Sequence, residues 1–519
     1  MRSRLVTRRS IAGVAVAGLG LVLMLLAAAG LFSGGSSAAS LPVSPAPPVA
    51  PVAQAPALRG AQPISSRDRV YTADQVSNTV TVINPKTDAV LGTIPLGHDR
   101  LDQILGPVDT SQINVHGLGF SRDGSKLDVI SVTSNAAQIV RAQDNRVMTA
   151  YVGRSPHEGF VSPDGRTLWV AVRGQDYVSV LDTRTGRELQ RIRTADGPSK
   201  VVFSPDGRLG YVNHLRAAEV DVIRVHDRRI VKRIRGVAPR SSDEALSPDG
   251  RELWLGHPFD AKVTVVDARR MRVLTILATG PRTNHPNFVT KSDGRNYAYV
   301  TVAGLNQVLV FRRAGAHPTL VKRIKTSGYA PHGIWPSPDN KRIYVALQKS
   351  DAVDVIDTAT DTVIKTLHVG QDPMALVYVA NAVPHGNGRR GLTHQGLGKR
   401  IQTIAAQVRG SAGTATVTIR ATDGIDELDF AARGLPPRKT FTAYGVRPDG
   451  TSSPLTAITA GADGNVDQAL AFTEFFGVYT QVYLAPGAAA AAAGNAEFCT
   501  LTGPRTLGES AARRATARR

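Results

Sequence analysis

A short turn phrase recurs six times in this 519-residue chain at nearly constant spacing. Its full form is Ser-Pro-Asp-Gly, and the copies are Ser121–Gly124, Ser162–Gly165, Ser204–Gly207, Ser247–Gly250, Ser292–Gly294 and Ser337–Asn340. Their closing residues stand 41, 42, 43, 44 and 46 positions apart, a spacing that indicates stacked repeats. Proline presets its φ, aspartate bonds the backbone beyond it, and glycine accepts a positive φ, so each copy predicts a tight turn.

Each repeat contains four short runs of β-forming residues. One run precedes the turn, as in Val201–Phe203, and a second follows it, as in Leu209–Val212. A third run, such as Val263–Val266, leads to a second turn, and a fourth run, such as Val363–Leu367, completes the period. Four antiparallel strands per period form a propeller blade. The repeats therefore predict an all-β fold with a seven-bladed β-propeller of four-stranded antiparallel blades.

The two ends of the repeat region complement each other. The chain enters at Arg69 with a second-strand phrase and no inner strand, whereas the last repeat carries a spare strand at Pro373–Val379. An unpaired strand would leave an exposed sheet edge. We therefore expect the C-terminal strand to complete the first blade.

The repeats also resemble a known family. Val70-Tyr-Thr-Ala73 with Asn78–Asn84, and Tyr344-Val-Ala346 with Ala352–Asp357, are similar to the YVTN β-propeller repeats of YncE-like exported proteins. The resemblance covers about residues 69–380 and implies an extracytoplasmic binding role. A propeller is a scaffold for many activities, so the resemblance itself does not define the chemistry.

The N-terminus predicts export. Arginines at positions 2, 4, 8 and 9 precede an uncharged apolar run, and Thr7–Ile11 resembles a twin-arginine signal; an ordinary secretory signal is the alternative. The run is also long enough to remain as a membrane anchor. We expect an extracytoplasmic protein that is secreted, associated with the cell wall or anchored in the membrane.

The chain divides into six predicted segments. These are a signal peptide or anchor at 1–39, a Pro/Ala-rich linker at 40–66, the propeller at 67–382, a Gly/His/Arg-rich linker at 383–403, a small β-sandwich-like domain at 404–486, and an Ala-rich basic tail at 487–519. The sandwich prediction rests on alternating runs such as Ala415–Arg420 and Val478–Leu484, separated by turn signals.

The charge balance points to anionic partners. Lys and Arg total 62 against 42 Asp and Glu, a formal net charge of +20. Such a protein attracts cell-wall phosphate polymers, anionic lipids or nucleic acid, and a dispersed solubilising charge is the alternative. The densest cluster in the propeller falls on a fourth strand, where a solvated edge is the simpler interpretation: Arg228, Arg229, Lys232, Arg233 and Arg235.

Histidines align at the entry of the inner strands. Counting back from each Pro-Asp-Gly turn puts one residue per blade at the mouth of the channel: His116, His157, Ser199, Ser242, His285, His332 and Met374. His285 aligns only with a one-residue insertion. Imidazoles with a nearby thioether suit copper, zinc or iron, so His116, His157, His285, His332 and Met374 are candidate metal ligands. The alternative is that these histidines cap backbone groups in a repeated turn.

The same face gathers other polar residues. Ser199, Lys200 and Ser242 belong to the inner-strand entries, and the loops between second and third strands add Arg173, His214, Arg216, His257 and Lys349. Together they form a candidate face for a protein or polyanionic ligand.

Catalysis has weaker sequence support. Glu158, Asp243 and Glu244 are candidate acidic groups for a lactonase-like enzyme, but their positions differ between blades, and nucleophile-elbow and metalloprotease motifs are absent from the sequence. The single Cys499 does not supply the ligands of a copper–cysteine domain such as nitrous oxide reductases require. The sequence therefore favours a non-enzymatic binding scaffold, with a metal-dependent redox or hydrolytic propeller as the alternative.

Overall fold

The computed structural model describes residues 61–97, 114–422 and 425–488. Contacts divide the chain into two units, 1–48 and 49–519, and every described residue belongs to the second. The predicted signal or anchor at 1–39, most of the linker at 40–66 and nearly all of the tail at 487–519 lie outside the described residues. Within the described part, no helix is long and apolar enough to cross a membrane.

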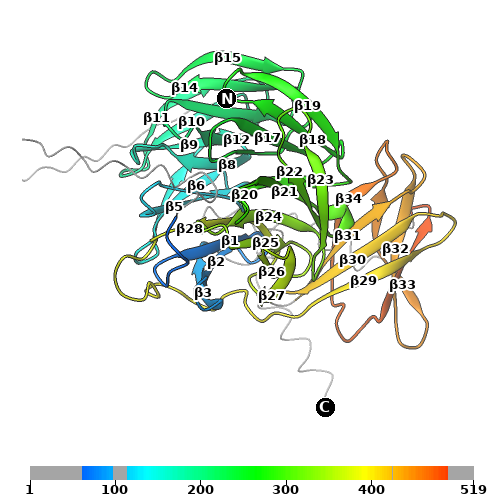
Figure 1. Cartoon of the computed structure of the whole chain (residues 1–519). Coiled ribbons are helices and arrows are strands. Elements are labelled where there is room, and N and C mark those ends of the chain that lie inside the picture. Colours follow the sequence, from blue (N-terminus) through cyan, green and yellow to red (C-terminus); the bar gives the residue numbers. More distant parts are fainter. Residues whose placement is uncertain (1–60, 98–113, 423–424, 489–519) are drawn as a thin grey trace, which may run out of the picture. The chain divides into compact units, whose positions relative to one another are not determined.

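Strands β1 to β28 form seven four-stranded antiparallel sheets, which confirms the predicted propeller (Figure 1). From the inner to the outer strand, the first three blades are as follows. Blade one contains β28 (Pro373–Val379), β1 (Arg69–Asp74), β2 (Thr79–Asn84) and β3 (Ala89–Pro95). Blade two contains β4 (Val115–Phe120), β5 (Lys126–Ser131), β6 (Ala136–Arg141) and β7 (Arg146–Tyr151). Blade three contains β8 (Pro156–Val161), β9 (Thr167–Val172), β10 (Tyr177–Asp182) and β11 (Glu188–Arg193).

The remaining four blades follow the same plan. Blade four contains β12 (Pro198–Phe203), β13 (Leu209–His214), β14 (Glu219–Arg224) and β15 (Arg229–Arg235). Blade five contains β16 (Asp243–Leu246), β17 (Glu252–His257), β18 (Lys262–Asp267) and β19 (Arg272–Ala278). Blade six contains β20 (Thr283–Thr290), β21 (Asn296–Val302), the 3-10 helix η1 (Ala303–Leu305), β22 (Gln307–Arg312) and β23 (Thr319–Lys325). Blade seven contains β24 (Pro331–Pro336), β25 (Arg342–Leu347), β26 (Ala352–Asp357) and β27 (Thr362–His368).

The ring closes as the sequence predicts. β28 pairs with β1, with Tyr71 opposite Val377 and Thr72 opposite Leu376, so the last strand completes the first blade. Each inner strand also contacts the inner strands of both neighbouring blades. Closure removes the two free edges that an open array of blades would expose.

The recurring phrase forms the expected turn. In blade three, Gly165 has a φ of +73° and its N–H donates to the carbonyl of Ser162, while the Ser162 hydroxyl donates to Asp164 at 2.6 Å. Blade six differs, because the N–H of Gly294 bonds the carbonyl of Lys291. Lys291 therefore holds the place that serine holds elsewhere, and the phrase in this blade begins one residue before Ser292.

The C-terminal domain is a small β domain, as the alternating runs predict, and its strands join in one nearly closed sheet. Its seven strands are β29 (Ile401–Val408), β30 (Thr414–Ala421), β31 (Asp426–Arg433), β32 (Thr440–Val446), β33 (Ser452–Thr459), β34 (Val466–Thr473) and β35 (Gln481–Pro486). They pair in the order β33-β32-β35-β29-β30-β31-β34, and the end strands β33 and β34 contact each other. The interior is filled from the inward-facing residues of this single sheet, including Val417, Phe430 and Phe441.

The segment at 383–403 packs on the propeller. Asn145 Nδ2 donates to the carbonyls of Gly388 and Arg390 at 2.9 Å each. Thr393 forms a backbone bridge with Thr93 of β3. The glycine- and arginine-rich stretch that predicts a linker is therefore held against blades one and two.

Candidate functional site

Inner strands enter their blades through irregular pairing at the channel mouth. In β8, Pro156 pairs with Val172 and Gly159 with Val170, so His157 and Glu158 together lie opposite a single residue. β20, β24 and β28 carry the same bulge. Bulges re-aim side chains, and here they place two residues per blade around the channel.

These positions define two rings of residues. We call the first ring the mouth layer, which consists of His116, His157, Ser199, Ser242, Asn284, His332 and Met374. We call the next ring the second layer, which consists of Gly117, Glu158, Lys200, Asp243, His285, Gly333 and Ala375.

His285 does not hold the position that counting from the turn predicts. Thr283 pairs with Val302 and Pro286 with Val300, so Asn284 is the equivalent of His157, and His285 lies one residue further along. The cause is that β20 has eight residues where β8 has six, and the extra length falls between the bulge and the turn. His285 therefore belongs to the second layer, level with Glu158 and Asp243.

The structure nevertheless brings all four histidines together. Nε2 of His116 lies 2.7 Å from Nε2 of His157, with ring centroids 4.3 Å apart. The ring of His332 lies 6.4 Å from that of His116 and 4.6 Å from that of His285. Blades two and three and blades six and seven thus contribute two imidazoles each to a single cluster.

Backbone carbonyls fix the orientation of two of these rings. Nδ1 of His157 donates to the carbonyl of Ser199 at 3.0 Å, and Nδ1 of His332 donates to the carbonyl of Met374 at 2.9 Å. Each ring then carries its lone pair on Nε2. His116 consequently donates from Nε2 to His157, and its own Nδ1 is buried without a hydrogen-bond partner among the described residues.

The surroundings keep the imidazoles neutral. Burial, and then the charge of Arg173, hold the pKa of His116 and of His157 well below the usual histidine value. Burial, followed by His285 and Arg282, does the same for His332. Burial also lowers the pKa of His285 to about 3. At neutral pH the cluster is therefore a set of uncharged nitrogen donors.

Arg173 lies beside the histidines at the end of β9. Its Nη2 donates to Ser199 Oγ, to Ser242 Oγ at 3.0 Å and to the Ser242 carbonyl at 3.2 Å. Its Nε is buried and has no partner among the described residues. Desolvation lowers the pKa of Arg173 to about 9. Ser199 and Ser242 thus hold this guanidinium in place. The backbone carbonyl of Arg173 accepts a hydrogen bond from Arg216 at 2.8 Å.

The second layer contains a buried string of charges. Lys200 Nζ lies 2.9 Å from Glu158 Oε2 and 2.8 Å from Asp243 Oδ2. Asp243 Oδ2 also lies 2.9 Å from Nδ1 of His285. Ligand atoms of Glu158, Asp243 and His285 lie within 4.8 Å of one another, but Lys200 is already the counter-ion of both carboxylates. Lys200 is therefore a buried partner within the channel and not part of an open face.

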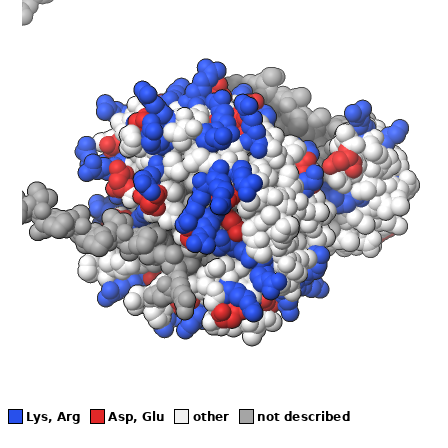
Figure 2. Space-filling model, turned by 45° about the horizontal axis from the view of Figure 1, so that its top comes forward, with Lys and Arg blue, Asp and Glu red and all other residues white. Residues whose placement is uncertain are grey.

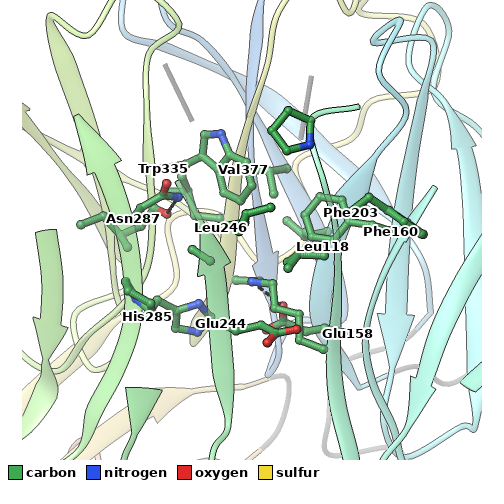
Figure 3. Close-up of a pocket in the computed structure, with 18 residues that line it drawn as sticks. Leu118, Glu158, Phe160, Phe203, Glu244, Leu246, His285, Asn287, Trp335 and Val377 are labelled. Atoms are coloured by element: carbon green, nitrogen blue, oxygen red, sulfur yellow. Dashed lines mark hydrogen bonds and ion pairs between the residues drawn. The ribbon is translucent and has the colours of Figure 1, made fainter. Parts of the chain in front are cut away.

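Beyond the second layer the channel becomes apolar. A cavity of about 20 Å³ is lined by residues that include Phe160, Leu246 and Trp335. Figure 3 shows His285, Glu244 and Glu158 at one end of this cavity and Trp335 at the other. Burial, and then Asp243, raise the pKa of Glu244 well above its usual value. The polar chemistry of the channel is thus concentrated at its mouth.

Two predicted face residues have structural partners within their blades. His214 is buried, and its Nδ1 donates to the carbonyl of Glu219 at 3.0 Å. His257 is also buried; Nδ1 donates to the carbonyl of Pro239 at 2.8 Å, and Nε2 accepts from Thr264 at 2.9 Å. Neither belongs to the imidazole cluster.

Lys349 is covered by the C-terminal sheet, which belongs to the same unit. It is buried and forms ion pairs with Asp429 of β31 and with Asp372. The neighbouring Arg420 of β30 is fully buried and pairs with Asp351 at 3.1 Å. The predicted ligand role of Lys349 is thus replaced by a role in attaching the sheet.

Basic residues on the outer strands are mixed with acidic ones. Figure 2 shows Lys and Arg side chains spread over one face with Asp and Glu between them. In blade four, Arg233 pairs with Asp221 at 3.0 Å and Arg235 lies 3.4 Å from Glu219. This pairing agrees with a solvated edge, and binding to a polyanion stays a prediction.

Some site residues were missed at the sequence level. The sequence places Lys200 on a ligand face, whereas the structure pairs it with Glu158 and Asp243. A signal existed, because Glu158, Lys200 and Asp243 each follow the aligned mouth residue directly. Asn284 was missed because the extra length of blade six concealed its alignment.

Comparisons with known proteins agree with the propeller fold. Residues 136–371 match the model of a family described as "Lactonase, 7-bladed beta-propeller". Protein NirF of Pseudomonas aeruginosa is 23% identical over 277 residues, which are 49% of this chain and 66% of NirF. Hydrazine synthase subunit beta of Kuenenia stuttgartiensis is 25% identical over 235 residues, 36% of this chain and 60% of that protein. The matches span less than two thirds of either relative.

Solved structures share the fold at low sequence identity. A functionally unknown protein from Desulfotomaculum acetoxidans superposes with a TM-score of 0.50 at 13% identity, covering 59% of this chain and 98% of its own. The periplasmic gluconolactonase PpgL of Pseudomonas aeruginosa has a TM-score of 0.48 at 21% identity, covering 60% and 99%. The first supports the propeller fold, and the resemblance to YVTN repeats stays a prediction.

Proposed function

We propose that the protein binds a transition metal ion at the channel mouth and uses it to act on a small molecule. The proposed ligands are the Nε2 atoms of His116, His157 and His332. One observation carries the proposal: the Nε2 atoms of His116 and His157 meet at 2.7 Å while Nδ1 of His157 and of His332 is held by a carbonyl.

Carbonyl anchoring is the usual support of a metal-binding histidine. A ligand histidine donates its other ring N–H to a carboxylate or carbonyl, which fixes both the tautomer and the direction of the lone pair. His157 and His332 have this arrangement before any ion binds. Because the low pKa values keep the rings uncharged, Nε2 of His157 and of His332 carries no proton that a metal ion would have to displace.

Binding requires the cluster to rearrange: His332 must approach the other two rings, since the described residues whose ligand atoms lie within 4.8 Å of one another are Glu158, Asp243 and His285. Two nitrogen ligands at about 2.0–2.1 Å from a tetrahedral zinc ion stand about 3.3 Å apart, so His116 and His157 must separate by about 0.6 Å. His116 must also move its proton from Nε2 to Nδ1. His116 Nδ1 has no hydrogen-bond partner among the described residues that would oppose this change.

The three imidazole ligands restrict which metal ions can bind and which reactions they can support. Three imidazoles suit zinc, copper, nickel or iron, and a three-histidine zinc site leaves one position for water or substrate. A zinc ion in such a site supplies a hydroxide at neutral pH and polarises a carbonyl group. Since the matched family is named for lactonases, we propose hydrolysis of a cyclic ester as the activity, in an extracytoplasmic location that the N-terminal sequence supports.

Metal analysis tests the site. Protein purified without an affinity tag and supplied with zinc, copper and iron should retain about one metal ion per chain. His332→Ala and His116→Ala should lose it, whereas His226→Ala, at a side chain that is 76% exposed, should not. Absence of stoichiometric metal from the wild-type protein would refute the proposal.

Acid release from simple five- and six-membered lactones tests the activity. We expect hydrolysis by the metal-loaded protein, loss after chelation and recovery on adding the ion back. Stoichiometric metal without turnover of any lactone would instead support a metal-dependent binding role, and the hydrolytic assignment would be rejected.

A further inference from the structure

Arg173 has a largely desolvated guanidinium that is hydrogen-bonded to no carboxylate in the part of the chain that the structure describes. Its hydrogen bonds go to Ser199 and Ser242, which are neutral. The nearby carboxylates of Glu158 and Asp243 are both bound to Lys200. Desolvation makes this charge costly and lowers the pKa of Arg173 to about 9, although the nearby charges of Glu158 and Asp243 partly offset the effect.

The unused donors of Arg173 remain at the mouth. Ser199 and Ser242 both bond Nη2, which fixes the plane of the group. Nε is buried and makes no hydrogen bond within the described residues, while the side chain as a whole is partly exposed. Nη2 is part of both paired edges of the guanidinium and is used by the serines, so Nη1 is the nitrogen left to donate a charge-assisted hydrogen bond to an oxyanion.

The charges around the cluster also favour an anion. Arg173 and Lys200 are balanced by Glu158 and Asp243, and the four imidazoles are neutral. A divalent ion on the histidines would leave the mouth with an excess of positive charge close to Arg173. A negatively charged ligand removes this excess and provides the partner that the guanidinium lacks.

We propose that Arg173 is the anchor for a carboxylate group of the ligand, which it holds beside the histidine cluster. The inference rests on the proposed function for the position of the metal ion, but the anion site itself depends only on Arg173 and its two serines. The ligand class is thus a small carboxylate, and the bound anion lies within reach of His116 and His157.

Acetate is the probe for this site, and acetamide is its neutral isostere. Saturable binding is measured by thermal shift at constant ionic strength, on the metal-free and the metal-loaded protein. We expect acetate to stabilise both forms, the metal-loaded one more strongly, and acetamide to stabilise neither. Inorganic phosphate tests whether the site prefers a carboxylate. If the protein binds phosphate more tightly than acetate, the assignment to a carboxylate is overturned.

Two variants complete the test. Arg173→Gln should weaken acetate binding by about tenfold or more, because hydrogen bonds to a charged group are lost, while the metal content stays unchanged. Arg193→Gln, at an arginine whose side chain is 87% exposed, should bind as the wild type does. Unchanged acetate binding by Arg173→Gln overturns the anion site whatever the metal content. A third outcome is that the wild-type protein contains no metal but binds acetate, and that Arg173→Gln weakens this binding. That outcome refutes the metal site alone.

Discussion

At the scale of single residues, the histidines of this propeller fall into two kinds that sequence cannot separate. His157 and His332 use Nδ1 for a backbone carbonyl, and Nε2 of His157 contacts only another imidazole of the cluster. His257 uses both nitrogens within its blade, one toward Pro239 and one toward Thr264. The partners of the second nitrogen, and not burial alone, decide which imidazole is available to a ligand.

His257 should make stability depend on pH. Burial lowers its pKa from 6.5 to about 4 in the folded protein, so the unfolded chain takes up the proton first as pH falls. Its contribution is therefore complete above about pH 6.5 and is lost between about pH 6.5 and 4, by about 3 kcal/mol. Urea unfolding across this range should show a flatter pH dependence for His257→Asn than for the wild type.

His226 provides the matched control. Its side chain is 76% exposed, so His226→Asn should leave the pH dependence as it is in the wild type. Parallel curves for wild type and His257→Asn would show that the proton uptake of unfolding comes from other groups.

The position of mouth residues could be predicted where the blades are regular. His116, His157 and His332 each stand five residues before the turn serine, and this count places them correctly. The count fails for His285 because β20 and β21 are longer than their counterparts in blade three. The sequence aligns Lys200 with Glu158 and Asp243, but it does not give the width of the channel, on which their contact depends.

At the scale of elements, β28 is the strand on which closure of the ring depends. It is buried along its whole length and joins the last part of the propeller sequence to the first, pairing with β1. Outer strands such as β11 are mostly exposed and pair on one side only. Closure of this propeller therefore depends on the pairing of one strand, β28, with β1.

Truncating a side chain of β28 should therefore cost more than the same change on an outer strand. Leu376→Ala, at a residue that is 3% exposed, should destabilise the protein by about 2–5 kcal/mol through lost burial and a residual cavity. Leu189→Ala on β11 should cost about 0.5 kcal/mol or less. The shift of the urea midpoint measures both, and equal shifts would show that β28 is not the closing element.

Strand alternation predicted the C-terminal elements but not how they join. Runs such as Ala415–Arg420 became strands, yet alternating patterns fit a two-layer sandwich and a nearly closed sheet equally well. The parallel pairing of β29 with β35 decides for the single sheet, and it joins residues far apart in the chain.

At the scale of the whole molecule, the described residues build two kinds of charged interior. Lys349 and Arg420 join the C-terminal sheet to the propeller through Asp429 and Asp351, and every member of that network has an opposite charge nearby. The channel mouth differs, because Arg173 has no hydrogen-bonded carboxylate among the described residues and Nδ1 of His116 is buried without a partner there. The first arrangement holds the fold together, and the second is complete only with a ligand.

The position of a bound metal tests this account most directly. Crystals of the metal-loaded protein, measured at the absorption edge of the metal found by analysis, should show one anomalous peak at the channel mouth. We predict that the peak lies about 2.0–2.1 Å from Nε2 of His116, His157 and His332. A peak at Glu158, Asp243 and His285, or a fully loaded protein whose metal lies outside the channel, would contradict the account.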